Sequence, residues 1–215
     1  MNIETESYLN QIENWPKTGK HILANYDDET IIVYQAYRAS IGNFALKHGY
    51  FGGDFRYTRM SWIKPNFLWM MYRSNWGTTT GQEIILAIRL RRKFFDDLLN
   101  LAIASSYSNK MTETQESWKH KIKTSSVRLQ WDPDHNPTGE KVERRAIQLG
   151  LRNNALESYG KTEALEIINM SEFVAEQREN RLSLDKLQMP RERVYIPEDT
   201  KKTLQVKKKT CQVAT

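Results

Sequence analysis

The stretch from Arg59 to Trp76 constrains the fold of this chain more than any other segment. It reads Arg59-Met-Ser-Trp-Ile-Lys-Pro-Asn-Phe-Leu-Trp-Met-Met-Tyr-Arg-Ser-Asn-Trp76. Pro65 suits the first position of a helix, and the residue before a proline prefers an extended backbone. The stretch therefore predicts a strand that ends near Lys64 and a helix over residues 66–74. Because this helix is apolar on nearly all sides, other elements must bury most of it.

The remaining elements are predicted from hydrophobic periodicity and turn residues. Strands are expected over residues 30–37, 55–63, 83–90, 126–131 and 144–151. Helices are expected over residues 40–46, 93–104, 153–158 and 164–177, with a helix or long loop over 105–126. Asp132-Pro133 is expected to stop the strand 126–131, because Asp-Pro commonly starts a turn. The predicted fold class is α+β, a single domain with a mixed or antiparallel central sheet of at least four strands and interleaved helices.

The size and composition of the chain suit one globular domain. It has 215 residues, of which 39% are hydrophobic and 27% charged, values typical of a globular protein. No apolar run approaches the roughly 18 residues that a spanning helix needs, and the acidic first residues do not resemble a secretory signal. We expect a cytoplasmic or nuclear protein without a membrane partner. Its predicted parts are a polar segment 1–19, a globular domain 20–197 and a disordered lysine-rich tail 198–215.

Metal and disulfide chemistry is not expected. Cys211 is the single cysteine, which excludes a disulfide framework and a zinc site built on several thiolates. The four histidines are scattered and show no ligand spacing. The sequence therefore predicts no metal site.

The distribution of positive charge is uneven. The net charge is +6, and the five lysines after Asp199 supply +5 of it, which leaves +1 (6 − 5) for the rest. Between residues 56 and 93, eight cations accompany one acid, Glu83. These cations are Arg56, Arg59, Lys64, Arg73, Arg89, Arg91, Arg92 and Lys93. A cation in apolar, ordered sequence needs a carboxylate or a phosphate as its partner.

Two interpretations of the Arg59–Trp76 stretch stay open. Trp62, Trp69 and Trp76 recur at intervals of seven and can simply fill a core. That interpretation leaves the cations of the stretch unexplained unless Asp54, Glu83 or Asp132 pairs with them. Without such pairs, a phosphate-bearing ligand is the natural complement, and the aromatic rings would suit a stacked base or nicotinamide.

Two further candidates lie at strand ends. Arg38 follows the strand 30–37, where it can serve a site or pair with Asp27, Asp28 or Glu29. Gln130 and Asp132 share one strand face, because side chains repeat every two residues. They can orient a sugar hydroxyl or stabilise a developing positive charge; alternatively, Asp132 only caps the strand before a turn.

The order of several motifs resembles the domain-of-unknown-function family 4291. The blocks are Val33-Tyr-Gln-Ala-Tyr, the Arg59–Ser74 stretch, Gln82-Glu-x-Ile-Leu-Ala-Ile, Val127-Arg-x-Gln-Trp-Asp-Pro and Arg145-x-Ile-Gln-x-Gly-Leu-Arg152. The resemblance covers roughly residues 20 to 197 and is specific, since the blocks agree in order. It implies no particular activity.

Over far fewer residues the chain also resembles ADP-ribosyltransferases. In many of these enzymes a strand ends in arginine, a later strand bears serine, and a Gln/Glu-x-Glu motif follows. Here Arg38, Ser61 and Gln130-Trp-Asp132 fall in that order. The resemblance implies that Arg38 holds a phosphate or ribose, that Ser61 supports the nicotinamide side, and that Asp132 stabilises an oxocarbenium ion. Asp132 stands where that family has glutamate, and a proline follows it.

The leading hypothesis is an enzyme that binds a nucleotide-like ligand, with NAD as the candidate cofactor and ADP-ribosyl transfer as the candidate reaction. The expected catalytic residues are Arg38, Ser61 and Asp132. The expected ligand-binding residues are Gln35, Arg59, Lys64, Tyr72, Arg73, Gln130 and Gln148. One rival is an RNA- or DNA-binding module that uses the cations of residues 56–93 and the lysine tail. Another is a non-catalytic interaction protein, and the oligomeric state stays open.

Overall fold

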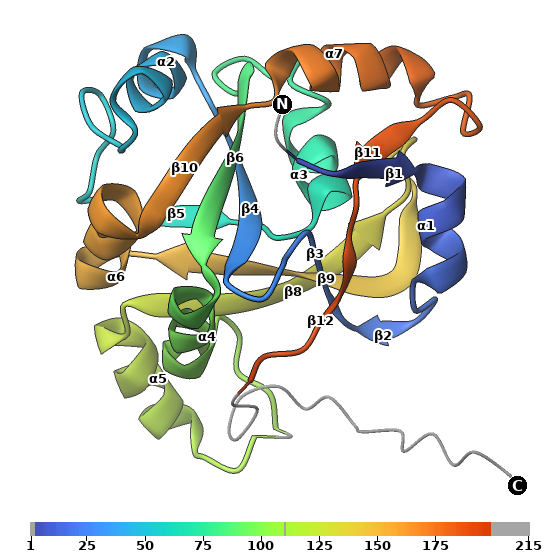
Figure 1. Ribbon diagram of the computed structural model, residues 1–215. Coiled ribbons are helices and arrows are strands. Elements are labelled where there is room, and N and C mark those ends of the chain that lie inside the picture. The colour runs from blue at the N-terminus through green and yellow to red at the C-terminus, as the bar shows by residue number, and fades with distance from the viewer. Residues whose placement is uncertain (1–2, 110, 199–215) are drawn as a thin grey trace, which may run out of the picture.

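The computed structural model describes residues 3–109 and 111–198, and the two larger of the four β-sheets in these ranges cross each other. The first sheet is antiparallel and has the order β10 (Ala164–Asn169), β6 (Ile84–Arg91), β4 (Thr30–Tyr37). The second has the order β2 (Gly19–Lys20), β9 (Lys141–Leu151), β8 (Val127–His135), β7 (Ile103–Ala104), with β5 (Ser61–Ile63) also paired to β9. Figure 1 shows the first sheet running down the molecule and β8 and β9 running across it. The predicted α+β class is confirmed.

In the three-stranded sheet, β4 and β6 are buried on both faces. Along β4, Ile31 and Val33 belong to a core shared with β8 and β9, while Ile32 and Tyr34 belong to a second core. The side chains of β6 alternate between the two cores in the same way, and Leu86 lies in the first core. Burial on both faces explains why these strands are nearly continuous apolar runs in the sequence.

The helix predicted over 66–74 forms as α3 (Phe67–Ser74), and six of its eight residues are buried. Asn66 caps it, because its side-chain oxygen accepts a hydrogen bond from the Trp69 amide at 2.7 Å. It ends at Asn75, whose φ of 48° is left-handed. The other helices are α1 (Tyr8–Asn14), α2 (Ala39–His48), α4 (Arg92–Leu101), α5 (Gln115–Thr124), α6 (Asn153–Ser158) with the π-helical turn η1 (Tyr159–Glu163), and α7 (Ser171–Asn180). Within the described ranges, no helix is long and apolar enough to cross a membrane.

Several predicted boundaries are wrong. The strand expected over 55–63 is limited to 61–63, and the helix expected over 93–104 ends at Leu101, before β7. The helix expected over 164–177 is in fact β10 followed by α7, because residues 164–169 pair with β6. Asp132-Pro133 does not stop its strand, since β8 continues to His135. Pro133 is tolerated because β7 pairs only with Arg128 and Leu129, which leaves β8 an edge strand at the proline.

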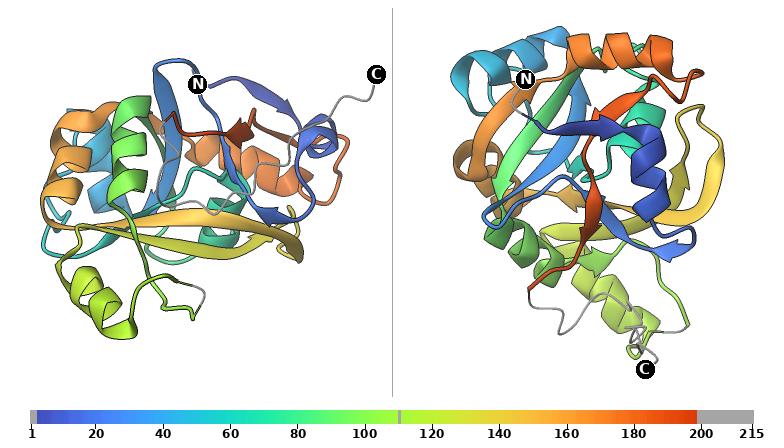
Figure 2. Two further views of the ribbon diagram at one scale, coloured as in Figure 1. Left: turned by 90° about the horizontal axis from the view of Figure 1, so that it is seen from below. Right: turned by 45° about the vertical axis from the view of Figure 1, so that its right-hand side comes forward.

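The two ends of the described chain lie together. β1 (Thr5–Ser7) pairs with β11 (Gln188–Pro190), and β12 (Arg193–Tyr195) pairs with β3 (Ile22–Ala24). The right-hand view of Figure 2 shows α1 and the β11–β12 segment on the same side of the molecule. The polar segment 1–19 thus packs on the domain from residue 3 onward. Apart from Glu198, the predicted tail 198–215, with Cys211, lies outside the described residues.

Candidate functional site

A groove runs along the ends of β4 and β5, and it consists of two adjoining hollows. The first has a volume of about 470 Å³ and is lined by Arg38, Asp54, Arg56 and Arg59, among others. The second, of about 410 Å³, is lined by Gln35, Lys64, Arg73, Gln82, Gln130 and Gln148, among others. Tyr37, Met60 and Ser61 line both hollows. Most of the predicted site residues therefore meet along one groove.

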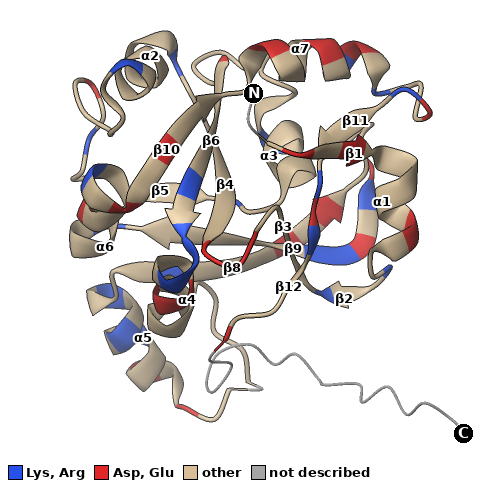
Figure 3. Cartoon of the chain, viewed as in Figure 1, with Lys and Arg blue, Asp and Glu red and all other residues tan. Residues whose placement is uncertain are grey.

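The eight cations of residues 56–93 divide into two groups. The four on β6 and α4 have carboxylate partners, and Figure 3 shows blue and red close together there. The pairs are Arg89–Glu166 (3.0 Å), Arg91–Glu163 (2.9 Å), Arg92–Glu198 (3.8 Å) and Lys93–Asp97 (2.9 Å). The other four form no ion pair with any described residue, and all of them line the groove. These are Arg56, Arg59, Lys64 and Arg73.

Arg38 lies at the wall of the first hollow, where its guanidinium contacts the Asp54 carboxylate at 3.0 Å. Its partner is thus Asp54, and the pairing with Asp27, Asp28 or Glu29 that the sequence suggested is wrong. Both side chains are 57% exposed, so the pair contributes little to stability. An anion in the first hollow can compete with Asp54 for this guanidinium.

Ser61 lies where the two hollows meet, inside a hydrogen-bond network. Its hydroxyl accepts from Gln35 Nε2 at 2.8 Å and shares a second hydrogen bond with the Tyr37 hydroxyl at 2.8 Å. The Tyr159 hydroxyl donates to Gln35 Oε1 at 2.6 Å, which fixes the orientation of that amide. Burial raises the pKa of Tyr37, so it stays protonated at neutral pH and cannot act as a base for Ser61. The network suits a positioned hydroxyl better than a nucleophile.

Asp132 lies behind the wall of the second hollow and holds two glutamines. Gln130 Nε2 donates to Oδ1 at 2.8 Å, and Gln148 Nε2 donates to Oδ2 at 2.7 Å. The shared face of Gln130 and Asp132 is confirmed by the hydrogen bond between their side chains, and Gln148 lies opposite Gln130 in the β8–β9 register. Because a carboxylate can only accept, the amide nitrogens turn to Asp132, and neither amide oxygen accepts a hydrogen bond from any residue that the structure describes.

Lys64 is a buried cation in the second hollow. Only 5% of it is exposed, and its ammonium has no hydrogen bond or ion pair to any residue in the described part of the chain. Its backbone is held by hydrogen bonds with Tyr34, from the Tyr34 amide to the Lys64 carbonyl at 2.7 Å and from the Lys64 amide to the Tyr34 carbonyl at 3.3 Å. Burial, reinforced by Arg73, lowers the pKa of Lys64 to about 8, against an opposing effect of Asp132.

The aromatic residues of the Arg59–Trp76 stretch have different roles. Trp69 and Trp76 are 7% and 6% exposed, which confirms the core interpretation for them. Trp62 is half-buried and lines the second hollow. Tyr72 does not reach the groove. It is 44% exposed, and its ring stacks on His135 at 3.5 Å between centroids.

A glycine of β9 allows the ring of Trp62, on the paired strand β5, to lie against β9. A Cβ atom at Gly150 would come within 2.8 Å of the Met60 sulfur and 3.0 Å of the Trp62 ring. Contacts this short would force both side chains away from β9. Gly150 therefore helps to shape the floor of the second hollow.

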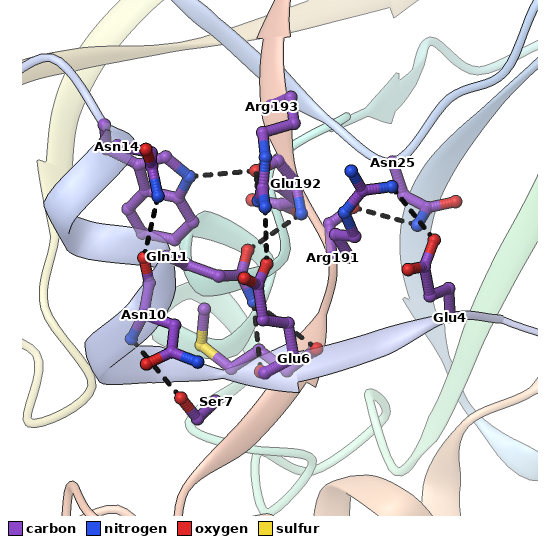
Figure 4. Close-up of polar contacts among 12 residues, drawn as sticks. Glu4, Glu6, Ser7, Asn10, Gln11, Asn14, Asn25, Arg191, Glu192 and Arg193 are labelled. Atoms are coloured by element: carbon purple, nitrogen blue, oxygen red, sulfur yellow. Dashed lines mark hydrogen bonds and ion pairs between the residues drawn. The ribbon is translucent and has the colours of Figure 1, made fainter.

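The helix that carries Arg73 is anchored by a fully buried acid, Glu192. Its carboxylate accepts from the Phe67 amide at 2.6 Å and from Asn66 Nδ2 at 3.2 Å, at the start of α3. The Glu192 amide in turn donates to Gln11 Oε1 of α1 at 2.8 Å (Figure 4). Burial raises the pKa of Glu192. The two terminal segments thus help to fix the position of α3 beside the groove.

Several residues that contribute to the groove were not among the binding residues predicted from the sequence. Tyr37 was within reach, because it shares a strand face with Gln35 and precedes Arg38. Arg56 could be predicted only as one of the eight cations, and Met60 and Gln82 only as members of the family motifs. Tyr159, which contacts the groove residue Gln35 from 124 positions away in the sequence, could not be predicted.

Together, these features define an α+β domain with two crossing sheets and a basic groove. In the part of the chain that the structure describes, no group of three or more His, Cys, Asp or Glu residues could hold a metal ion. A family model described as Domain of unknown function (DUF4291) matches residues 21–195, so the chain belongs to that family. The family predicted from the sequence is thereby confirmed. A comparison with curated proteins gave no match.

Proposed function

We propose that the groove binds a nucleotide-like anionic ligand. The observation that carries the proposal is the division of the eight cations of residues 56–93, because the four of them that lack a carboxylate partner among the described residues all line the groove. Phosphate oxygens are the natural acceptors for such guanidinium groups. In this proposal, Arg56 and Arg59 hold phosphate in the first hollow.

The second hollow suits the sugar or base of the same ligand. The amide oxygens of Gln130 and Gln148 accept hydrogen bonds from hydroxyl or amino groups, and the half-buried Trp62 ring offers a stacking surface. The two volumes, about 470 and 410 Å³, fall within the range of small-molecule sites, roughly 300–1,000 Å³. Ser61, between the hollows, is placed to contact the middle of an extended ligand.

Replacement of Arg59 by alanine is expected to weaken nucleotide binding about 10- to 100-fold, because a charge-assisted hydrogen bond contributes about 1.5–3 kcal/mol. The measurement is calorimetric titration with NAD, ADP-ribose, ADP, adenosine and inorganic phosphate. Arg178→Ala is the matched control, since Arg178 pairs with Glu179 on α7 and does not line the groove. It should leave the affinity unchanged.

The same titration distinguishes the proposed small-molecule site from the rival interpretation, a nucleic-acid-binding module. A short oligonucleotide that binds while every mononucleotide fails, with affinity falling steeply with salt, would favour a nucleic-acid-binding module. If no nucleotide binds, or if Arg59→Ala and Arg178→Ala behave alike, the proposed site is wrong.

A reaction on NAD is the candidate activity. Arg38 lines the first hollow, Ser61 lines both, and Gln130 lines the second, so the motif residues follow one another along the groove. In this reaction the bond from the ribose carbon to nicotinamide breaks, and its electron pair leaves with nicotinamide. The oxygen of water or another acceptor then bonds to the ribose carbon and loses its proton. Asp132, behind Gln130, would stabilise the positive charge that develops on the ribose.

This activity predicts that wild-type protein releases nicotinamide from NAD and that Asp132→Asn lowers the rate about 100-fold. Chromatography of the products measures the release. Asp185→Asn is the control, because Asp185 is exposed and does not line the groove. If the wild type binds NAD without releasing nicotinamide, this reaction is excluded, and the binding proposal remains.

A further inference from the structure

Lys64 differs from the three lysines that form ion pairs in the described part of the chain. Lys93, Lys121 and Lys161 are 84%, 53% and 51% exposed, and each contacts a carboxylate. Lys64 is 5% exposed, and its ammonium is unpartnered within the described ranges, although it lines the second hollow. An ammonium that is largely removed from water and lacks a partner is costly. Retention of such a group at the wall of a hollow is typical of a chemical role.

The surroundings of this amine favour its neutral form. Arg73 of α3 lines the same hollow and opposes a second positive charge. Asp132 of β8 favours the charged form, but both of its oxygens are already engaged by Gln130 and Gln148. With a pKa lowered to about 8, roughly a quarter of Lys64 is neutral at pH 7.5, against about 0.1% of an ordinary lysine.

We propose that the Lys64 amine is a nucleophile that forms an imine with the aldehyde of a phosphorylated reducing sugar. The choice of a sugar phosphate as the ligand rests on the proposed function. The choice of imine formation as the reaction rests on the burial of Lys64, on its lack of a partner and on its place in the second hollow. Arg73, in the same hollow, binds the anionic group. A second guanidinium in place of Lys64 could bind an anion equally well but could not attack a carbonyl.

The reaction balances without an oxidant or reductant. The lone pair of Nζ bonds to the carbonyl carbon, and the π electrons of the carbonyl move to its oxygen, which takes a proton from nitrogen. The resulting carbinolamine loses its hydroxyl and a second nitrogen proton as water, and a C=N double bond forms. The amide oxygens of Gln130 and Gln148 can accept from the carbinolamine hydroxyl and hold it in place.

The test is reductive trapping. The full-length protein is incubated with ribose 5-phosphate or ribose and cyanoborohydride, and the modified lysines are located and timed by peptide mass spectrometry. We expect Lys64 to react at least about tenfold faster than Lys93 at pH 7.5, with a half-maximal rate near pH 8. Ribose 5-phosphate should react at lower concentration than ribose, since only the former carries an anion for Arg73.

Two variants identify the modified site. Lys64→Arg should remove the fast phase, whereas Lys93→Arg should retain it, and thermal melting confirms that both are folded. If Lys64 reacts no faster than Lys93 while nucleotides bind, the inference is wrong and the proposed function stands. If Lys64 reacts fast while no nucleotide binds, the imine chemistry stands for sugar phosphates alone, and the nucleotide-like ligand of the proposed function is excluded.

Discussion

Replacement of Arg144 by methionine is expected to destabilise the protein by about 3–5 kcal/mol, because it leaves a buried carboxylate without its partner. Arg144 is 7% exposed and Asp134 is 1% exposed. The guanidinium Nε and Nη2 lie 2.7 and 2.6 Å from the same Asp134 oxygen, and Nη1 donates to the Pro16 carbonyl at 2.8 Å. The guanidinium also lies 5.1 Å from the centre of the Trp15 ring. One side chain therefore joins the N-terminal segment to β8 and β9.

Urea unfolding at pH 7 measures this loss, and the melting temperature should fall by roughly 6–20 °C. Asp134→Leu together with Arg144→Met should recover a large part of the stability, because the double variant buries no unpaired charge. Arg178→Met is the control, since the Arg178 guanidinium pairs with the exposed acid Glu179. A loss below about 1 kcal/mol for Arg144→Met would show that Asp134 finds another partner or reaches water.

Replacement of Lys64 by methionine is expected to stabilise the protein at pH 7 by about 1–3 kcal/mol. The pKa of Lys64 is lowered from 10.5 to about 8 in the folded protein. The unfolded chain therefore binds more protons between these values, and wild-type stability rises with pH across that window. Below pH 8 the wild type carries the full cost of the buried ammonium, which methionine, of similar length, does not have.

The advantage of Lys64→Met should shrink as the pH rises from 8 to 10.5, because the wild-type amine becomes neutral in both states. Parallel urea titrations of both proteins across this range give the difference at each pH. Lys93→Met, at an exposed position, should show no such trend. If Lys64→Met is less stable than the wild type at pH 7, the Lys64 ammonium has a favourable partner, and the conclusion that it lacks one is wrong.

Local physics accounts for the parts of the fold that the sequence predicted. The helix over 66–74 is encoded by Pro65, by the capping side chain of Asn66 and by an unbroken apolar run. The shared face of Gln130 and Asp132 follows from the two-residue repeat of a strand. In contrast, residues 164–169 form β10 because β6 offers an edge to pair with, and no local pattern records that edge.

The candidate site, too, could be predicted from the sequence only in part. Arg59, Lys64 and Arg73 could be singled out because the sequence around them holds almost no acids. The pairing of Arg89 with Glu166 could not be predicted, since it depends on the contact between β6 and β10. For the same reason, the sequence could not show which cations of residues 56–93 were free of carboxylates.

The most direct test of the groove follows the side-chain amide signals of the glutamines by ¹H–¹⁵N NMR during titration with ADP-ribose. Saturable shifts are expected for Gln130 and Gln148, whose amide oxygens can accept from the ligand because no described residue donates to them. Gln11 and Gln177, buried elsewhere, should keep their positions. Shifts confined to glutamines outside the groove, or no shifts at concentrations that saturate calorimetric binding, would contradict the proposed site.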